Sequence, residues 1–152
     1  MNKDEFYMRE ALREAKKAFD RDEVPVGAVI VHKGTIIARA HNQIKMLKDP
    51  TAHAEMIAIT QATNYLQNER LIGCRMYVTI EPCSMCAGAM VLARIEKLIY
   101  AASDPKTGAC GSIINIIDHK RLNHKVKIEK GILKQEASLL IKEFFRRKRK
   151  AL

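Results

Sequence analysis

Two short segments of the chain carry side chains that could bind a metal and handle protons. They are Thr51-Ala52-His53-Ala54-Glu55 and Glu81-Pro82-Cys83-Ser84-Met85-Cys86. A catalytic zinc site has three protein ligands and keeps its fourth position open for water. His53, Cys83 and Cys86 supply three such ligands, and Glu55 lies two residues beyond the histidine. We therefore expect one zinc ion in each subunit, with Glu55 left free to carry protons.

Hydrolysis is the chemistry that this set of residues favours. Zinc lowers the pKa of a bound water towards neutral, and a nearby carboxylate can then take the proton of that water. Residues i and i+2 diverge by about 200° around a helix, so His53 can reach the metal while Glu55 faces a substrate. This requires that the segment begin a helix. Both metal-binding segments are expected to do so, and the positive end of a helix dipole favours thiolates.

The Cys-x-x-Cys spacing has two other interpretations, a redox centre and a structural zinc site. Structural zinc takes four protein ligands, and no second Cys-x-x-Cys or histidine pair completes a set of four. The remaining histidines have no ligand-like spacing to the cysteines: His32, His41, His119 and His124. Cys74 and Cys110 follow no pattern, and we expect them to be small buried residues. A catalytic zinc site is the favoured interpretation.

Length and composition describe a single globular domain over residues 1–152. The chain is 47% hydrophobic and 29% charged, and its length suffices for one ordinary core. No apolar run approaches the roughly 18 residues of a membrane span, and the first residues do not form a signal-peptide core. We expect a cytoplasmic protein with no membrane association and no nucleotide cofactor.

The positive charge of the chain is concentrated in its second half. The formal net charge is +10, and residues 76–152 contribute +8 of it. An excess of positive charge on one part of a surface favours a polyanionic partner. The alternative is a solvated face that binds nothing. The basic residues form two groups, which are the segment of Lys120, Arg121, Lys125 and Lys127 and the run Arg146-Arg147-Lys148-Arg149-Lys150.

Hydrophobic periodicity predicts helices that alternate with short strands. Helices are expected over residues 4–21, 53–65, 83–94 and 132–150, with Thr51 as the N-cap of the second and a short helical turn over 113–118. Strands are expected over 24–31, 35–41, 97–102 and 125–129, and another within 71–80, most clearly over 76–80. A tight turn is expected at Lys33-Gly34, and loops over 42–50 and 103–112. This order predicts an α/β fold with three layers, α/β/α, around a central mixed five-stranded sheet.

The pattern H-x-E…P-C-x-x-C is typical of zinc-dependent nucleobase deaminases. Beyond it, the sequence resembles the bacterial tRNA-specific adenosine deaminases, a family of the cytidine deaminase-like superfamily, along nearly the whole chain. The segments that carry the resemblance are 24–29, Asn42, 49–55, 82–90, 104–109, 123–124, 131–133 and 144–146. The resemblance implies a cytidine deaminase-like fold and a homodimer. It implies the conversion of adenosine to inosine at the wobble position of a tRNA anticodon, usually that of tRNA-Arg(ACG).

The resemblance also implies roles for individual residues. It makes His53, Cys83 and Cys86 the zinc ligands and Glu55 the proton shuttle, while a zinc-activated water attacks C6 of the base. Around that centre it implies substrate contacts by Val26, Asn42, Ala54, Asp104, Lys106, Asn123, Phe145 and Arg146. Because Phe144 and Phe145 are adjacent on a helix, they cannot both face one core. One of them is expected to be buried, and the other is available to stack on a base.

Two rival functions belong to the same set of residues. One is a small-molecule deaminase that acts on guanine or on a cytosine nucleoside, and the other is a non-catalytic zinc module that binds RNA. The charge of residues 76–152 favours an RNA substrate, because a small-molecule deaminase has no need of a +8 half-chain. Sequence-specific recognition of RNA concentrates in loops, and a loop base is easier to extrude than a duplex base. We expect a tRNA anticodon stem-loop as the partner.

Overall fold

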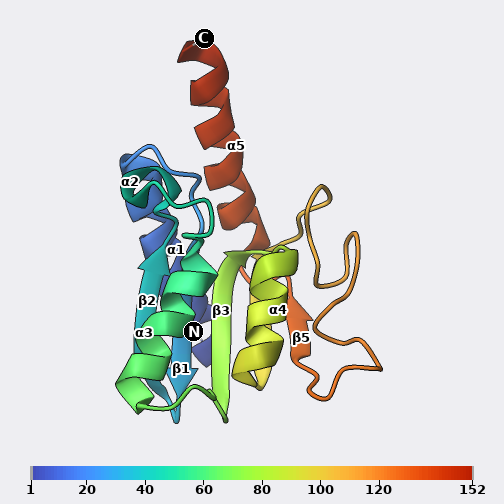
Figure 1. Cartoon of the computed structure of the whole chain (residues 1–152). Helices are drawn as coiled ribbons and strands as arrows, with labels where there is room; N and C mark the ends of the chain where they lie inside the picture. The colour runs from blue at the N-terminus through green and yellow to red at the C-terminus, as the bar shows by residue number, and fades with distance from the viewer. Residues whose placement is uncertain (1, 152) are drawn as a thin grey trace.

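The computed structural model describes residues 2–151, and its centre is one mixed sheet of five strands in the order β2-β1-β3-β4-β5 (Figure 1). The strands are β1 (Gly27–His32), β2 (Thr35–His41), β3 (Cys74–Ile80), β4 (Lys97–Ala102) and β5 (Lys127–Lys130). β1 pairs antiparallel with both β2 and β3, whereas β4 pairs parallel with β3 and β5. The expected mixed five-stranded sheet is confirmed.

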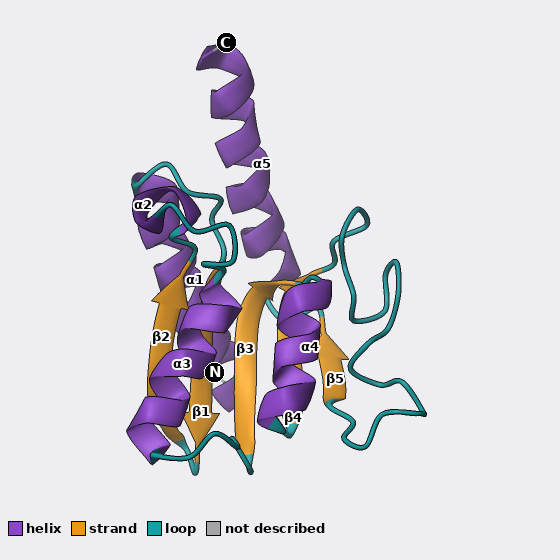
Figure 2. Ribbon diagram, viewed as in Figure 1, coloured by secondary structure: helices purple, strands orange, loops and turns teal. Residues whose placement is uncertain are grey.

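Helices cover both faces of the sheet, as Figure 2 shows. They are α1 (Lys3–Asp20), α2 (Ile44–Leu47), α3 (Ala54–Leu66), α4 (Ser84–Ala93) and α5 (Lys134–Ala151). α3 and α4 lie side by side on one face, and α1 lies on the other. α5 packs against β4 and α1, and its far end extends beyond the sheet (Figure 1). The three-layer α/β/α architecture is therefore confirmed.

Alternation along the strands divides the interior into two cores. Successive side chains of a strand point to opposite faces of its sheet. Ile30, Met76 and Leu98 accordingly belong to a core that includes Ala58 of α3 and further residues of α4. Val29 and Ile99 belong to a second core, with residues of α1 and α5. Both faces of the central strands are thus apolar, which explains their nearly continuous hydrophobic runs.

Strand direction brings four distant segments to one edge of the sheet. β3 and β4 are parallel, so the residues that follow Ile80 and Ala102 emerge at the same edge. β1 runs in the opposite direction, and its first residue, Gly27, pairs with His41 at the end of β2. Residues 24–26, 42–55, 81–86 and 103–107 therefore converge there. Ligand sites of α/β sheets commonly lie at such an edge.

The contact between α1 and β1 requires a glycine. A Cβ atom on Gly27 would overlap the backbone oxygen of Ala11 and the backbone nitrogen of Ala15 in α1. The helix therefore passes directly over the start of β1, and Gly27 N–H donates to Thr79 Oγ1 of β3 at 3.1 Å. This contact fixes the segment just before β1, which contributes to the site described below.

Some predicted boundaries were wrong at segment ends. β1 begins at Gly27 and not at residue 24, and β5 covers Lys127–Lys130 and not 125–129. Thr51 is not the N-cap of α3. Its hydroxyl donates to Asp49 instead, and His53 occupies the N-cap position. α5 begins at Lys134 because Gly131 and Leu133 adopt positive φ angles, which interrupt a helix.

Two loops also differ from the prediction. The loop over 42–50 contains the short helix α2, whose first backbone N–H groups are bound by the buried carboxylate of Glu23. The helical turn predicted over 113–118 does not form. An isolated bridge between Cys110 and Asn115 replaces it. Among residues 2–151, no helix combines the length and apolar character needed to cross a bilayer.

Candidate active site

The three predicted metal ligands meet where α3 and α4 begin. His53 and Cys83 are the N-cap residues of these helices, and neither side chain bonds the backbone of its helix. The Nδ1 atom of His53 lies 3.7 Å from Sγ of Cys83 and 3.7 Å from Sγ of Cys86. All three donor atoms lie within 4.8 Å of one another. Tetrahedral zinc, with its bonds of about 2.0–2.3 Å, places sulfur and nitrogen ligands about 3.5 Å apart. The donor set therefore fits zinc.

The two thiols behave as a pair. A hydrogen bond from the Cys86 thiol, helped by the backbone N–H groups of Met85 and Cys86, lowers the pKa of Cys83 to about 5. The same thiol–thiol bond, together with burial, raises the pKa of Cys86 far above its usual range. At neutral pH the pair therefore holds one proton between two sulfurs. A divalent cation displaces that proton when it binds both thiolates.

Glu55 lies in the first turn of α3, next to the ligands and almost completely buried. Burial raises the pKa of its carboxyl to about 7, while its own backbone N–H and His53 act in the opposite direction. A carboxyl group with a pKa near neutral can both accept and return a proton at physiological pH. Its position and its pKa suit the proton-carrying role expected of it.

A cavity of about 560 Å³ opens in front of these residues. It contains His53, Glu55 and Cys83 in its wall, together with five of the residues expected to bind substrate: Val26, Asn42, Asp104, Lys106 and Phe145. The other three expected substrate contacts, Ala54, Asn123 and Arg146, do not line it. Ala54 is fully buried and its backbone N–H donates to Asn42, Asn123 lies in the exposed loop before β5, and Arg146 pairs with Glu143 on α5.

Asn42 joins two of the converging segments. It is buried at the end of β2, and its side-chain oxygen accepts the backbone N–H of Ala54 at 2.8 Å. This bond holds the first turn of α3, and with it His53 and Glu55, against the end of β2. Within residues 2–151, the amide NH₂ group of Asn42 makes no hydrogen bond to another side chain or to the backbone. That group is the part of Asn42 that can bind a ligand in the cavity.

Asp104 organises the turn that carries Lys106. Its carboxylate accepts the backbone N–H groups of Lys106 and Thr107, at 3.0 and 3.2 Å, and the hydroxyl of Thr107 at 2.8 Å. These bonds occupy most of the acceptor capacity of the carboxylate. Lys106 thus presents a cation at the cavity wall from a turn that Asp104 shapes.

Residues that were not expected from the sequence also line the cavity. On α5 they are Ser138, Ile141 and Lys142, which join Phe145 on one helical face. Their spacing with Phe145 follows i, i+3, i+4 and i+7, a pattern that could have identified this face. Glu81 also lines the cavity and is almost completely buried. A charged residue at the end of an apolar strand was the available signal.

The structure separates the roles of the two adjacent phenylalanines. Phe144 is buried, and its ring lies 6.2 Å from that of Phe19 in α1. Phe145 is 43% exposed and lines the cavity. The prediction that one ring is buried and the other available is confirmed. Phe144 anchors α5, and Phe145 faces the cavity.

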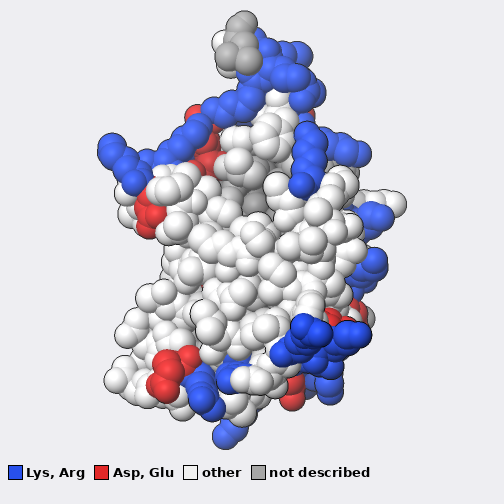
Figure 3. All heavy atoms as spheres, turned by 45° about the vertical axis from the view of Figure 1, so that its right-hand side comes forward, with Lys and Arg blue, Asp and Glu red and all other residues white. Residues whose placement is uncertain are grey.

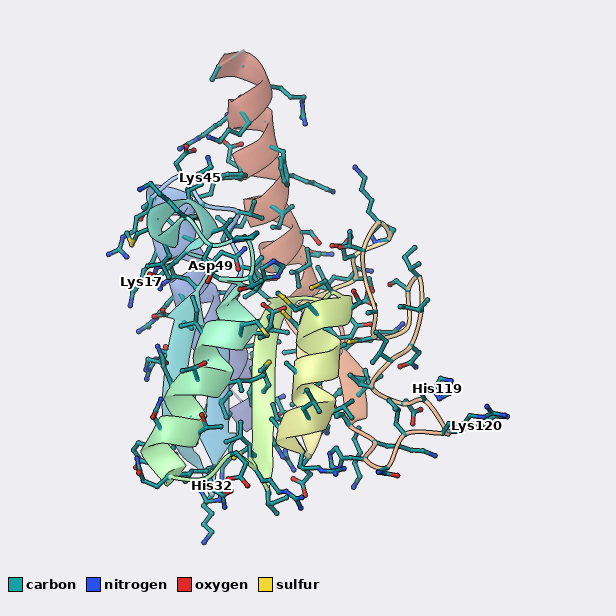
Figure 4. The ribbon with its side chains drawn as sticks, in the orientation of Figure 1. Lys17, His32, Lys45, Asp49, His119 and Lys120 are labelled. Atoms are coloured by element: carbon teal, nitrogen blue, oxygen red, sulfur yellow. The ribbon has the colours of Figure 1, made fainter. Side chains whose placement is uncertain are left out.

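The two basic groups lie in different places. In Figure 3, Lys and Arg side chains cover the far part of α5 and gather again lower on the same face. Near the end of α5, Arg147 and Lys148 contact Phe19 and Asp22 of the α1 end. Figure 4 places Lys120 on the outer loop, pointing away from the body of the protein. Neither group lines the cavity, but the α5 run begins directly after Phe145, which does.

A comparison with known proteins places this site among deaminases. The family model described as MafB19-like deaminase matches residues 1–149. The "tRNA-specific adenosine deaminase" of Aquifex aeolicus is 54% identical over 145 residues, which cover 95% of each chain. The protein of the same description from Bacillus subtilis is 48% identical over 150 residues, covering 99% of this chain and 93% of its own.

Solved structures agree with this placement. A structure from a study of A-to-I editing by tRNA:A34 deaminases at the wobble position superposes with a TM-score of 0.86 at 44% identity. The match covers 89% of this chain and 98% of the other. A guanine deaminase from Nitrosomonas europaea superposes with a TM-score of 0.80 at 23% identity, covering 92% and 83% of the two chains. At that identity the second likeness concerns the fold alone.

Proposed function

The chain belongs to the tRNA-specific adenosine deaminases of the MafB19-like deaminase family, and from that premise we propose its reaction and mechanism. The reaction is the hydrolysis of adenosine to inosine at the wobble position of a tRNA anticodon. The observation that carries the mechanism is the placement of Glu55 beside three donor atoms that fit zinc, in the wall of a cavity. A zinc ion held there supplies Lewis acidity that lowers the pKa of the attacking water.

Glu55 carries the protons of this reaction. Its carboxylate takes a proton from the attacking water and delivers it to N1 of adenine while the water oxygen bonds to C6. The second proton then goes to the amino group, the C6–N6 bond breaks and ammonia leaves. Burial supports this role, because it excludes bulk water and holds the pKa of Glu55 near neutral.

RNA is the substrate that the cavity walls favour. Phe145 and Lys142 of α5 and Lys106 of the loop over residues 103–112 place an aromatic ring and two cations in the cavity wall. A ring of this kind can stack an unpaired base, and the cations attract phosphates. Asn42 offers its amide group to the extruded nucleotide, and Val26 contributes an apolar wall. Asn123 and Arg146 lie outside the cavity, so we propose that they contact the RNA only away from the reacting nucleotide.

Substrate choice and assembly are finer parts of the proposal. The family resemblance supports tRNA-Arg(ACG) as the substrate and the cytoplasm as the place of action. We further propose a homodimer. Three exposed apolar side chains on or near the layer of α3 and α4 support it, namely Tyr65, Ile72 and Leu92, of which Leu92 is 82% exposed. Sedimentation equilibrium measures the assembly, and a monomer at micromolar concentration rejects it.

An inosine assay tests the function. The purified protein is incubated with tRNA-Arg(ACG). One portion of the RNA is digested to nucleosides to measure inosine, and another portion is sequenced around the anticodon to locate it. We expect inosine at the wobble position, and none when that adenosine is replaced by guanosine. Turnover of guanine or cytidine without any inosine in tRNA rejects the proposal in favour of a small-molecule deaminase. RNA binding without any deamination favours the non-catalytic module.

Truncation after Phe145 should weaken tRNA binding and flatten its dependence on salt. The truncation removes the basic run 146–150, which directly follows the cavity-lining Phe145 along α5, and keeps both Phe144 and Phe145. The logarithm of the association constant falls linearly with the logarithm of the salt concentration, and each phosphate contact makes this slope steeper by about 0.7–0.9. Loss of several contacts should therefore make the slope shallower by about 2–3, as measured by fluorescence anisotropy between low and physiological salt.

The control for this truncation is the double variant Lys33→Gln, Arg75→Gln. It removes two exposed cations from the end of the sheet opposite to the cavity, where β1 ends and β3 begins, and it should bind tRNA with nearly the parental slope. Zinc content should be unchanged in both proteins. Equal slopes of log K against log salt for the truncated and parental chains would reject a role of residues 146–150 in RNA binding.

A further inference from the structure

The buried carboxylate of Glu81 has no role in the chemistry described above, yet it makes more hydrogen bonds than any other side chain near the cavity. It accepts the backbone N–H groups of Asp104, Cys110 and Ser112, each at 3.0 Å. The hydroxyl of Ser112 donates to it as well. All four donors belong to the loop over residues 103–112. One side chain at the end of β3 therefore binds this loop at both of its ends.

The loop encloses the carboxylate closely. A Cβ atom on Gly108 would overlap the carboxyl carbon and Oε1 of Glu81. Only glycine allows the loop to pass at this distance. Backbone bonds add to the contact, because Ala109 N–H donates to the oxygen of Pro82 at 2.9 Å. The loop is thus built around Glu81 and Pro82.

The chemistry of the four donors requires a carboxylate. Among residues 2–151, no lysine or arginine forms an ion pair with Glu81, so N–H and O–H groups alone compensate its buried charge. A carboxylate can accept at four positions with both oxygens, whereas the amide of glutamine accepts at only one oxygen and donates at the nitrogen. Glutamine at this position would face backbone donors with a donor of its own, and would leave buried N–H groups unpaired.

Glu81 connects the metal ligands with the opposite wall of the cavity. It lies two residues before Cys83 along the backbone, and the loop it binds places Asp104, Lys106 and Thr107 in the cavity wall. Four of the hydrogen bonds that set the spacing between these two segments are therefore made by a single side chain, in addition to the backbone bond from Ala109 to Pro82. His53 and Glu55 are positioned by the start of α3 and its bond to Asn42, and their positions do not depend on Glu81.

We propose that Glu81 is a positioning residue that holds the loop over residues 103–112 across the cavity, so that Lys106 meets the RNA backbone beside the reacting nucleotide. This inference rests on the proposed function. Glu81 touches neither the reacting atoms nor the metal. Its contribution is to substrate affinity and to the rigidity of the loop, and not to the chemical step.

The test compares Glu81→Gln with Glu10→Gln. Glu10 is also a buried carboxylate, but it lies on α1, where it pairs with Arg13 and Arg39 on the far side of the sheet. The first measurement is native-state trypsin cleavage after Lys106. Unpaired buried donors favour opening of the loop, so Glu81→Gln should speed this cleavage about tenfold or more relative to cleavage at other sites. Glu10→Gln should leave that ratio at the parental value.

The second measurement is steady-state deamination of an anticodon stem-loop. Glu81→Gln should raise KM about tenfold while kcat and zinc content change less than about threefold, because the loop binds substrate and does not act on the base. Should Glu81→Gln fail to fold, Ser112→Ala removes one of the four donors, and it should raise both the cleavage ratio and KM by a smaller factor.

Two results would overturn the inference. One is unchanged cleavage after Lys106 and unchanged KM in both Glu81→Gln and Ser112→Ala. The other is faster cleavage at every site together with equal losses in kcat and zinc, which indicates a structural role only. Cleavage is independent of activity. If the parental chain forms no inosine, the proposed function fails, and the cleavage ratio alone then decides whether Glu81 holds the loop.

Discussion

Replacing Glu55 with glutamine should lower the rate of inosine formation by about 10²–10⁴-fold, the range that a general acid–base group contributes. Glutamine preserves the volume of the side chain in a position that is almost completely buried. It can neither accept the proton of the attacking water nor return it to the leaving amine. The loss should appear in the single-turnover rate at saturating RNA, because the substitution affects the chemical step.

Zinc binding separates this explanation from simple damage to the site. The three donor atoms belong to His53, Cys83 and Cys86, and the carboxylate of Glu55 is not one of them. Glu55→Gln should therefore hold one zinc ion per chain, as measured by mass spectrometry of metals in the purified protein. Glu10→Gln serves as the control with a buried carboxylate on the opposite side of the sheet. Activity within a few-fold of the parental value, or loss of zinc along with activity, would contradict the assigned role.

Removing the metal with a chelator should abolish deamination and destabilise the protein. The donor set is two thiolates and one imidazole, which favours zinc over oxygen-seeking cations. Added Zn²⁺ should restore activity, and added Mg²⁺ should not. A ligand that binds the folded state at 100 times its Kd stabilises that state by about 2.7 kcal/mol. The metal-free chain should therefore unfold about 5–10 °C lower, as measured by calorimetry.

Acid should release the metal, because the two thiols that bind it become protonated. Metal binding requires both sulfurs deprotonated, so protons compete with the metal and its affinity falls as the pH falls. The thiol of Cys83 has its pKa lowered to about 5, whereas the pKa of Cys86 is raised. Competition therefore comes mainly from Cys86 above pH 5 and from both thiols below it. Activity that survives complete removal of the metal would reject the zinc mechanism.

Local spacing explains why the centre of the site was predictable. His53 and Glu55 are two residues apart, and Cys83 and Cys86 three apart, so the geometry of a helix start determines how each pair projects. The core strands were predictable because Val29 and Ile30 belong to a run that is buried on both sides. The adjacency of Phe144 and Phe145 likewise allowed only one of them to be buried.

Long-range contacts explain what was not predictable. The hydrogen-bond partners of Glu81 come from a loop about 20–30 residues later, and the residues next to Glu81 in the sequence do not predict them. α2 is a single turn with no apolar periodicity, and the bonds from Glu23 that stabilise it come from a different loop. The bridge between Cys110 and Asn115 likewise forms in a loop built around Glu81. Periodicity describes how a segment packs, but not which distant carboxylate organises it.

Because α5 contributes one wall of the cavity, the parts of the site are synthesised in a definite order. All of the metal ligands and Glu55 precede residue 87, whereas Ser138, Ile141 and Phe145 leave the ribosome much later. If α5 binds RNA as proposed, the ribosome adds the groups that perform the chemistry before it adds the part of the cavity wall that retains the substrate. Retention of an RNA substrate would then begin only once α5 has been synthesised.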